Sequence, residues 1–232
     1  MTEHVLYSYL IYAGFASAAL VFFFLLFFTA PYGRHVRAGW GPTVPNRLGW
    51  ILMETPAVFS ILIFCLAARS HALGVVWVLL GIWQTHYLYR TYVFPFLLHS
   101  RGKRIPVLIA VSGMGFNVFN GYLNGRHLAW AADSYTASWL LDPHFLAGLF
   151  LFICGFAINI YSDSVLIRIR KDRETGYAIP NGGLYRWISC PNYFGELVEW
   201  CGWALLTWSL AGVVFAVWSA ANLVPRALSN HR

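Results

Sequence analysis

Seven long runs of apolar residues constrain most strongly what this chain of 232 residues can fold into. A helix needs about 20 mostly apolar residues to cross the hydrocarbon core of a bilayer, and roughly 17 is the lower limit. Most runs meet that length outright, and the fifth does when its neighbours Pro143 and Ser162 are counted. The runs cover residues 5–28, 50–68, 72–89, 105–123, 145–160, 192–206 and 207–224.

These runs predict an all-α, multi-pass membrane protein with about seven transmembrane helices in one bundle. We expect one transmembrane domain over residues 1–232, with no second domain and no internal repeat. The first run is interpreted as a helix rather than a cleaved signal peptide, because Glu3 and His4 precede it in place of a basic segment. Only Ser209–Gly212 is available as a turn between the last two helices.

The positions of lysine and arginine predict the orientation. If the N-terminus is outside, 14 of the 16 basic residues fall in connections on the cytoplasmic side, and only Arg69 and Arg126 fall outside. Cytoplasmic connections of membrane proteins carry such an excess. We therefore expect the N-terminus outside and the C-terminus in the cytoplasm. The same distribution explains the net charge of +7 without nucleic acid as a partner.

The cysteines and histidines do not indicate a metal site. The four cysteines form no C-x-x-C pair, and three of them lie inside apolar runs. The eight histidines form neither an H-x-x-x-H nor an H-E-x-x-H pattern. Buried structural thiols and no bound metal are expected.

Two polar residues lie at a similar depth in the predicted second and third helices. Glu54 comes four residues after Trp50, where the second helix enters from the cytoplasmic side. Tyr87 comes three residues before Arg90, where the third helix leaves on that side. A charged carboxyl at the centre of a membrane helix costs roughly 2.5–3.5 kcal/mol. An isolated glutamate here therefore indicates a functional site.

The predicted sixth helix carries a polar face. Asn192, Glu196, Glu199 and Trp203 follow the spacing i, i+4, i+7 and i+11, so they lie on one side of a helix and cannot all face lipid. Asn159 and Asp163 are expected to close the cytoplasmic end of the fifth helix. We therefore expect a polar pocket in the cytoplasmic half, between the second, third, fifth and sixth helices. Alternatively, Glu199 pairs with a donor on a neighbouring helix and Asn159 holds two helices together.

Residues 163–186 are expected to form a cytoplasmic loop rich in arginine and glycine. Its arginines are typical of anchors on the cytoplasmic side, while a glycine-rich backbone near cations is typical of a phosphate site. The usual dinucleotide fingerprint is absent, because Val118 stands where G-x-G-x-x-G after Gly113 requires glycine. Any dinucleotide is therefore bound by another kind of fold.

Several motifs resemble the family of membrane steroid 5α-reductases over most of the chain from about residue 30. They are HYLYRTYVF (86–94), NIYSD (159–163), GYAIPNGGLY (176–185) and PNYFGELVEWCGWALLTWSL (191–210), with PYGRH (31–35) and MET (53–55) in support. The C-terminal half also resembles a wider group that includes sterol, polyprenol and enoyl-CoA reductases and membrane methyltransferases. Members of the steroid family continue past the position of SNHR into a further aromatic tail.

The resemblance implies NADPH-dependent reduction of the Δ4 double bond of 3-oxo-Δ4 steroids to 5α-dihydro steroids. Glu54 and Tyr87 would hold the C3 carbonyl as the catalytic pair. We also expect a monomer in the bacterial inner membrane or the endoplasmic reticulum, with a steroid or related lipid and the lipid bilayer as partners. The implied cofactor site consists of Gly33, Arg90, Lys103, Asn159, Asp163, Arg168, Arg170, Tyr177, Asn192 and Glu196.

Three other functions stay open at this point. A reductase of a polyprenol, a sterol or an enoyl-CoA would use similar chemistry. A methyltransferase that uses S-adenosylmethionine would share the P-x-Y-x-G portion at residues 191–195 but has no obvious use for Glu54 opposite Tyr87. A sterol-binding or structural membrane protein would need neither that pair nor the cytoplasmic arginines.

Overall fold

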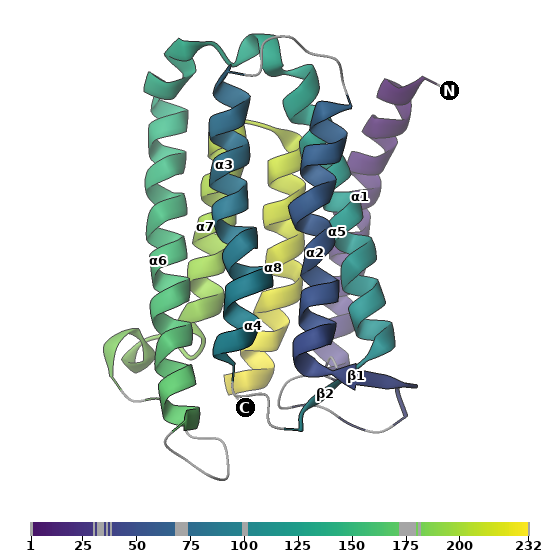
Figure 1. Cartoon of the computed structure of the whole chain (residues 1–232), viewed down its shortest axis with the longest axis vertical. Coiled ribbons are helices and arrows are strands. Elements are labelled where there is room, and N and C mark those ends of the chain that lie inside the picture. The colour runs from purple at the N-terminus through teal and green to yellow at the C-terminus, as the bar shows by residue number, and fades with distance from the viewer. Residues whose placement is uncertain are drawn as a thin grey trace. The chain divides into compact units, whose positions relative to one another are not determined.

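The computed structural model describes residues 2–29, 31, 35, 37, 39–67, 74–98, 102–171, 180 and 182–231, with only the backbone described for Arg170 and Lys171. Long helices account for most of these residues, as the apolar runs predict (Figure 1). The helices are α1 (Glu3–Phe27), α2 (Asn46–Leu66), α3 (Gly74–Leu88), α4 (Phe94–Leu97), α5 (Val107–Trp130), α6 (Pro143–Lys171), α7 (Pro191–Thr207) and α8 (Leu210–His231).

Short elements connect the helices. Strands β1 (Thr43–Pro45) and β2 (Arg104–Pro106) pair antiparallel and directly precede α2 and α5. A π-helical turn, η2 (Tyr89–Val93), joins α3 to α4 without a break. The 3₁₀ turns are η3 (Ala132–Ser134), η4 (Ala137–Leu141) and η5 (Gly183–Arg186).

Four of the described helices are long and apolar enough to cross a membrane: α1, α2, α6 and α8. Helices α3 and α7 are shorter, with 15 and 17 residues, and α5 is interrupted by several asparagines. Each of the seven apolar runs thus corresponds to a helical stretch. The number of spans and the orientation of the termini stay predictions.

The chain divides into two compact units. The first unit comprises Met1–Leu10 and Ala30–Phe145, and the second comprises Ile11–Thr29 and Leu146–Arg232. Helices α1 and α6 contribute residues to both. Each unit is described by itself below, and the single domain expected from the sequence stays a prediction.

In the first unit, helix α2 is the centre of the packing. It runs antiparallel to α3, because the indole Nε1 of Trp50 donates to the Arg90 carbonyl (3.2 Å) and that of Trp83 to the Ala57 carbonyl (3.0 Å). It runs parallel to α5, where Gly121 faces Ser60 and Gly125 lies against the Ile61 carbonyl. A Cβ on Gly125 would lie 2.6 Å from that oxygen, so these glycines allow the two helices to approach closely.

In the second unit, α6 and α7 pack antiparallel with backbone against backbone. A Cβ on Gly195 of α7 would lie 2.6 Å from the Asn159 nitrogen of α6. A Cβ on Gly148 of α6 would lie 2.6 Å from the Leu206 nitrogen of α7. Small residues commonly permit such close helix approach in membranes. Helix α8 then folds back along α7, where the Trp200 and Phe215 rings lie 4.3 Å apart.

The turn between α7 and α8 is shorter than Ser209–Gly212, the turn expected from the sequence. It consists of Trp208, whose φ of 43° lies in the left-handed region, and Ser209. A left-handed residue commonly ends a helix, although glycine is the usual choice. The Ser209 hydroxyl then accepts a hydrogen bond from the Gly212 N–H (2.9 Å) and caps α8.

Two expected helix ends are wrong. Asp163 does not close its helix, because α6 continues two turns further to Lys171. No glycine or proline interrupts residues 163–171, so the N-terminal part of the expected cytoplasmic loop is helical. The third helical stretch does not end at Arg90 either, but continues to Leu97.

The physical reason for the π-helical turn is Pro95. Proline has no N–H to donate to the carbonyl four residues back and its ring clashes with that carbonyl. The chain instead widens by one residue, and the Phe94 N–H bonds to the Tyr89 carbonyl five residues back. The helical path therefore continues through Arg90 to Leu97. Such turns often occur at functional sites.

Candidate active site

The register between α2 and α3 places Glu54 level with Tyr87. Side-chain hydrogen bonds pair residue 50 with 90, residue 57 with 83 and residue 58 with 84. Because the helices run in opposite directions, residue 54 lies opposite residues 86 and 87. Tyr87 is 3% exposed and Glu54 is half-buried. This common level agrees with the expectation from the sequence, and the catalytic roles of the two residues stay a prediction.

Helix α5 supplies a hydrogen-bond donor to Glu54. The Asn117 amide nitrogen donates to the Glu54 Oε2 (3.2 Å) and to the Met53 carbonyl (2.8 Å). Asn117 is 5% exposed. The sequence interpretation missed this residue. Its signal is the spacing of Asn117, Asn120 and Asn124, which puts three amides on one face of an otherwise apolar helix.

Aromatic rings surround Tyr87. The Trp83 ring centroid lies 4.8 Å from that of Tyr87, and the His86 ring lies 5.0 Å away in an edge-on arrangement. These rings exclude water from the phenol, since Trp83 and His86 are also buried. A hydrogen bond in such an environment is stronger than one in water.

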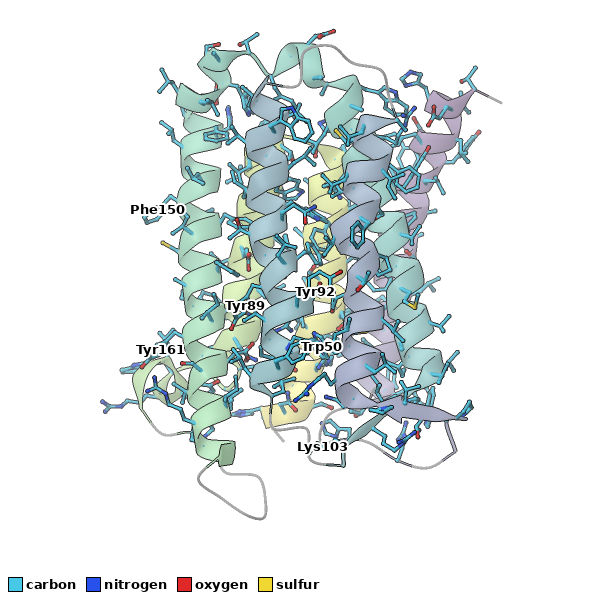
Figure 2. All side chains as sticks on the ribbon, viewed as in Figure 1. Trp50, Tyr89, Tyr92, Lys103, Phe150 and Tyr161 are labelled. Atoms are coloured by element: carbon cyan, nitrogen blue, oxygen red, sulfur yellow. The ribbon has the colours of Figure 1, made fainter. Side chains whose placement is uncertain are left out.

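Arg90 lies between aromatic rings at the next turn. Its guanidinium carbon is 4.9 Å from the Trp50 ring centroid and 4.5 Å from that of Phe94. These are cation–π distances. Figure 2 labels Trp50 on α2 and Tyr89 on the π-helical turn that carries Arg90. The Thr91 hydroxyl in this turn is buried and makes no hydrogen bond to the described residues.

A second polar cluster joins α6 to α7 in the second unit. The Asn159 amide donates to the Asn192 carbonyl (2.9 Å), and the Asn192 amide donates to the Asp163 Oδ1 (2.9 Å). The exposed fraction is 2% for Asn159 and 4% for Asp163. The close backbone approach at Gly195 brings these side chains together.

The backbone around this cluster carries two further polar groups. The Tyr185 hydroxyl donates to the Ser162 carbonyl (3.0 Å) and ties η5 to α6. The Ser162 hydroxyl is fully buried and has no hydrogen-bond partner among the described residues. A buried polar group of this kind costs about 1–3 kcal/mol unless a ligand or water meets it.

Helix α7 extends the cluster on the face expected from the sequence. Glu196 lies one turn after Asn192 and is partly buried. Glu199 and Trp203 are completely buried, which confirms that this part of the face avoids lipid. The interpretation missed Arg226 of α8, which donates to the Tyr193 hydroxyl (2.9 Å) beside Asn192.

The remaining predicted site residues are either exposed or lie outside the described residues. Lys103 and Arg168 are exposed, and Lys103 bonds through its carbonyl to the Asn46 N–H (3.0 Å); Figure 2 labels Lys103 beside β2. Gly33, Tyr177 and the side chain of Arg170 lie outside the described residues. The described part of the chain contains no group of three His, Cys, Asp or Glu residues that could hold a metal ion.

The candidate residues thus form two clusters, one in each unit. Glu54, Tyr87 and Arg90 gather in the first unit, and Asn159, Asp163, Asn192 and Glu196 gather in the second. The first part offers a half-buried carboxyl and a phenol buried beside aromatic rings, which can polarise a carbonyl group. The second offers amide and carboxylate groups that can hold a polar ligand. A single pocket containing all of them stays a prediction.

Comparison with known proteins identifies similar chains. Residues 103–232 match the family model described as 3-oxo-5-alpha-steroid 4-dehydrogenase. That range includes the whole cluster of the second unit, while Glu54 and Tyr87 lie before it.

Individual relatives extend the similarity to the first part of the chain. Steroid 5-alpha-reductase DET2 of Arabidopsis thaliana is 41% identical over 96% of this chain and 86% of its own length. The 3-oxo-5-alpha-steroid 4-dehydrogenase 1 of Bos taurus is 40% identical over 100% of this chain and 91% of its own length. That of Homo sapiens is 38% identical over 86% of this chain and 77% of its own length.

Proposed function

This chain belongs to the family of 3-oxo-5-alpha-steroid 4-dehydrogenases, which are oxidoreductases acting on CH–CH groups, and we propose that it reduces 3-oxo-Δ4 steroids to 5α-dihydro steroids with NADPH. The observation that carries the proposal is that Glu54 and Tyr87 lie at the same level on two neighbouring antiparallel helices of the first unit. Four helices long enough to span a membrane fit a protein that takes a poorly soluble substrate from the bilayer.

The first part of the site suits the charge that develops in this reaction. Hydride addition at C5 of a conjugated enone moves negative charge to the C3 oxygen as an enolate. A donor aimed at that oxygen stabilises the transition state more than the substrate. Tyr87 donates its phenolic hydrogen, and Glu54 either donates a proton of its own or orients Tyr87. Protonation at C4, from Tyr87 or from water, completes the reaction.

The second part fits the polar head of a nicotinamide cofactor, because the buried Ser162 hydroxyl lacks a partner among the described residues beside a carboxylate and two amides. A nicotinamide cofactor, when bound, supplies the hydride. Asn159, Asp163, Asn192 and Glu196 would hold its nicotinamide and ribose. We assign the phosphates and the outer ribose to the remaining predicted residues, which are Gly33, Arg90, Lys103, Arg168, Arg170 and Tyr177. Arginines favour NADPH over NADH, since they pair with its 2′-phosphate.

Family membership removes two of the open alternatives. An oxidoreductase acting on CH–CH groups is neither a methyltransferase nor a non-enzymatic sterol-binding protein. The relatives named above are steroid reductases, which favours a steroid over a polyprenol or an enoyl-CoA.

The test uses purified protein in nanodiscs with NADPH and either testosterone or progesterone. We expect wild type to form the 5α-dihydro product, measured by mass spectrometry. Glu54→Gln and Tyr87→Phe should each lose about 10²- to 10⁴-fold in turnover, the usual range for a positioned acid–base group. Their affinity for NADPH should stay within threefold of wild type.

Tyr92→Phe is the matched control, because Tyr92 carries the same phenol on the same helical stretch but is exposed. It should keep wild-type turnover. If wild type binds NADPH but reduces no steroid, the substrate class is wrong. If NADPH does not bind, the cofactor is wrong.

A further inference from the structure

The buried amide of Asn117 has no assigned role in the reaction, although it contacts the glutamate of the proposed catalytic pair. Its nitrogen lies 2.8 Å from the Met53 carbonyl and 3.2 Å from the Glu54 Oε2. Both neighbours accept hydrogen bonds. The atom between them must therefore be the NH₂ group, because an amide oxygen would face two acceptors. One amide hydrogen serves each oxygen.

The position of Asn117 is set by close packing of α5 against α2. Gly113 and Gly121 lie one turn before and one turn after it. A Cβ on Gly113 would run into the Met53 side chain, and one on Gly121 would run into Ser60. The two glycines thus bring the helices near enough for the short Asn117 side chain to reach the α2 backbone. The Ser60 hydroxyl also donates to the Asn117 carbonyl (3.1 Å) and fixes α5 at this residue.

A glutamate side chain has several rotatable bonds, and ordering it costs free energy. A donor on a neighbouring helix reduces the number of conformations that the carboxyl can adopt. It also distinguishes the two carboxyl oxygens, because Oε2 accepts from Asn117 and is the poorer place for a proton. A proton carried by Glu54 then sits on Oε1.

We propose that Asn117 is a positioning residue for Glu54: it holds the carboxyl in one orientation and designates Oε1 as the oxygen that carries or exchanges a proton. This inference rests on the proposed reductase function. Catalysis requires groups to be placed before the reaction begins, since even small displacements of a donor weaken transition-state stabilisation. Asn117 acts through Glu54 and does not need to touch the substrate.

The first test replaces Asn117 by Leu, which has nearly the same shape but no donor. Loss of a hydrogen bond to an ionisable group predicts a fall in kcat of about 10- to 100-fold. The KM for the steroid and the affinity for NADPH should stay within threefold, because neither ligand loses a contact. Asn117→Gln keeps the donor and should retain at least tenfold more activity than Asn117→Asp, which places a second acceptor against Glu54. If the leucine variant does not fold, the comparison of Asn117→Gln with Asn117→Asp still tests the proposal.

Asn124→Leu is the matched control. Asn124 is as deeply buried as Asn117, lies two turns along on the same face, and donates to Asn120 rather than to Glu54. Its kcat per folded molecule should stay within threefold of wild type. An equal loss in both leucine variants would mean that α5 is merely disturbed, and the proposal would be overturned.

A double-mutant cycle separates positioning from a general structural effect. In the Glu54→Gln background, Asn117→Leu should reduce kcat by less than threefold, since the carboxyl that Asn117 orients for proton exchange is already gone. A full further loss of 10- to 100-fold would overturn the proposal.

Infrared spectroscopy gives a readout that needs no turnover. The carboxyl band that disappears in Glu54→Gln should shift in Asn117→Leu, and an unshifted band would reject the contact. Product formation by wild type tests the proposed function separately, so the two ideas can fail independently.

Discussion

The two polar clusters of this protein are built in different ways. In the first unit, Glu54 and Tyr87 lie on separate helices, Tyr87 lies beside the Trp83 ring, and Asn117 contacts the carboxyl from a third helix. In the second unit, Asn159, Asn192 and Asp163 bond to one another along a single helix pair. The first arrangement suits groups that change protonation or charge during a reaction. The second suits a fixed frame that binds a ligand.

The two clusters also differ in how closely the helices that carry them are packed. Helices α2 and α5 meet mainly through a glycine on α5 and a side chain on α2 at Gly113 and Gly121, and a glycine meets the α2 backbone closely at Gly125. Helices α6 and α7 meet through backbone on both sides, with Gly155 against the Gly195 carbonyl. A side chain can move aside, whereas two helix backbones cannot do so without separating. The second unit should therefore tolerate less change.

The largest expected effect comes from adding a methyl group between α6 and α7. In Gly155→Ala the new Cβ would lie 2.5 Å from the Gly195 carbonyl oxygen. Such overpacking typically costs 1–3 kcal/mol or more. We expect a melting temperature several degrees lower, a smaller folded fraction on size exclusion, and weaker NADPH binding. Gly115→Ala is the control, because among the described residues no atom beyond its own helical turn lies within 4 Å of its Cβ position. Equal melting temperatures would refute this account of the packing.

The second-largest expected effect distinguishes binding of NADPH from binding and reduction of the steroid. Asp163→Leu removes the acceptor of the Asn192 amide. Losing a hydrogen bond to a charged group predicts about 10- to 100-fold weaker NADPH binding, measured by fluorescence titration. The KM for the steroid at saturating NADPH should hardly change. Ser164→Ala, at the next position of α6, removes a bond to the Tyr161 carbonyl and should leave both values unchanged. If Asp163→Leu raised only the KM for the steroid, the second cluster would be the steroid site and not the cofactor site.

A smaller effect tests the register of the first unit. Trp50→Phe removes the hydrogen bond to the Arg90 carbonyl but keeps an aromatic ring beneath the guanidinium. A loss of about 0.5–1.5 kcal/mol is expected. This should lower the melting temperature by a few degrees and kcat by a few-fold, as Glu54 and Tyr87 become less well aligned. Trp77→Phe, at an exposed position of α3, should change neither. A change in NADPH affinity instead would contradict this account.

The smallest effect concerns pH and lies at the start of helix α6, where Asp142 precedes the helix. The His144 backbone N–H and then its ring bond to Asp142, and they hold the pKa of that carboxyl below its usual range. A lowered pKa stabilises the folded state above the usual range of aspartate, and this contribution disappears as the pH falls through the folded pKa. Asp142→Asn should therefore give a slightly shallower loss of melting temperature in acid, with unchanged turnover at pH 7. An unchanged acid slope would contradict the role of this contact.

Much of the fold could be predicted from the sequence because hydropathy is a local property. A run of about 20 apolar residues indicates a helix without knowledge of its neighbours. The ends were less predictable: α6 passes Asp163, and the helical path through Arg90 continues to Leu97. In both cases the reason is local backbone chemistry, namely the lack of a helix breaker after Asp163 and the missing N–H of Pro95.

The candidate site was predictable in part. Spacing alone placed Asn192, Glu196 and Glu199 on one helix face, because the α-helical repeat is constant. The predicted end of the fifth helix indicated Asn159 and Asp163, and the resemblance implied their role in binding a cofactor. No pattern in the sequence shows which side chain of α5 meets Glu54, since three asparagines lie on the same face.

The sequence by itself determined that this is an all-α chain with helices able to span a membrane, and that carboxyl groups are buried within it, because these depend on composition and spacing along the chain. Only the tertiary structure decided that Asn117 reaches Glu54 and that Asn192 joins Asp163. Those contacts depend on how each helix is rotated and shifted against its neighbour. Packing at glycines such as Gly121 and Gly195 sets that register, and it involves residues far apart in the chain.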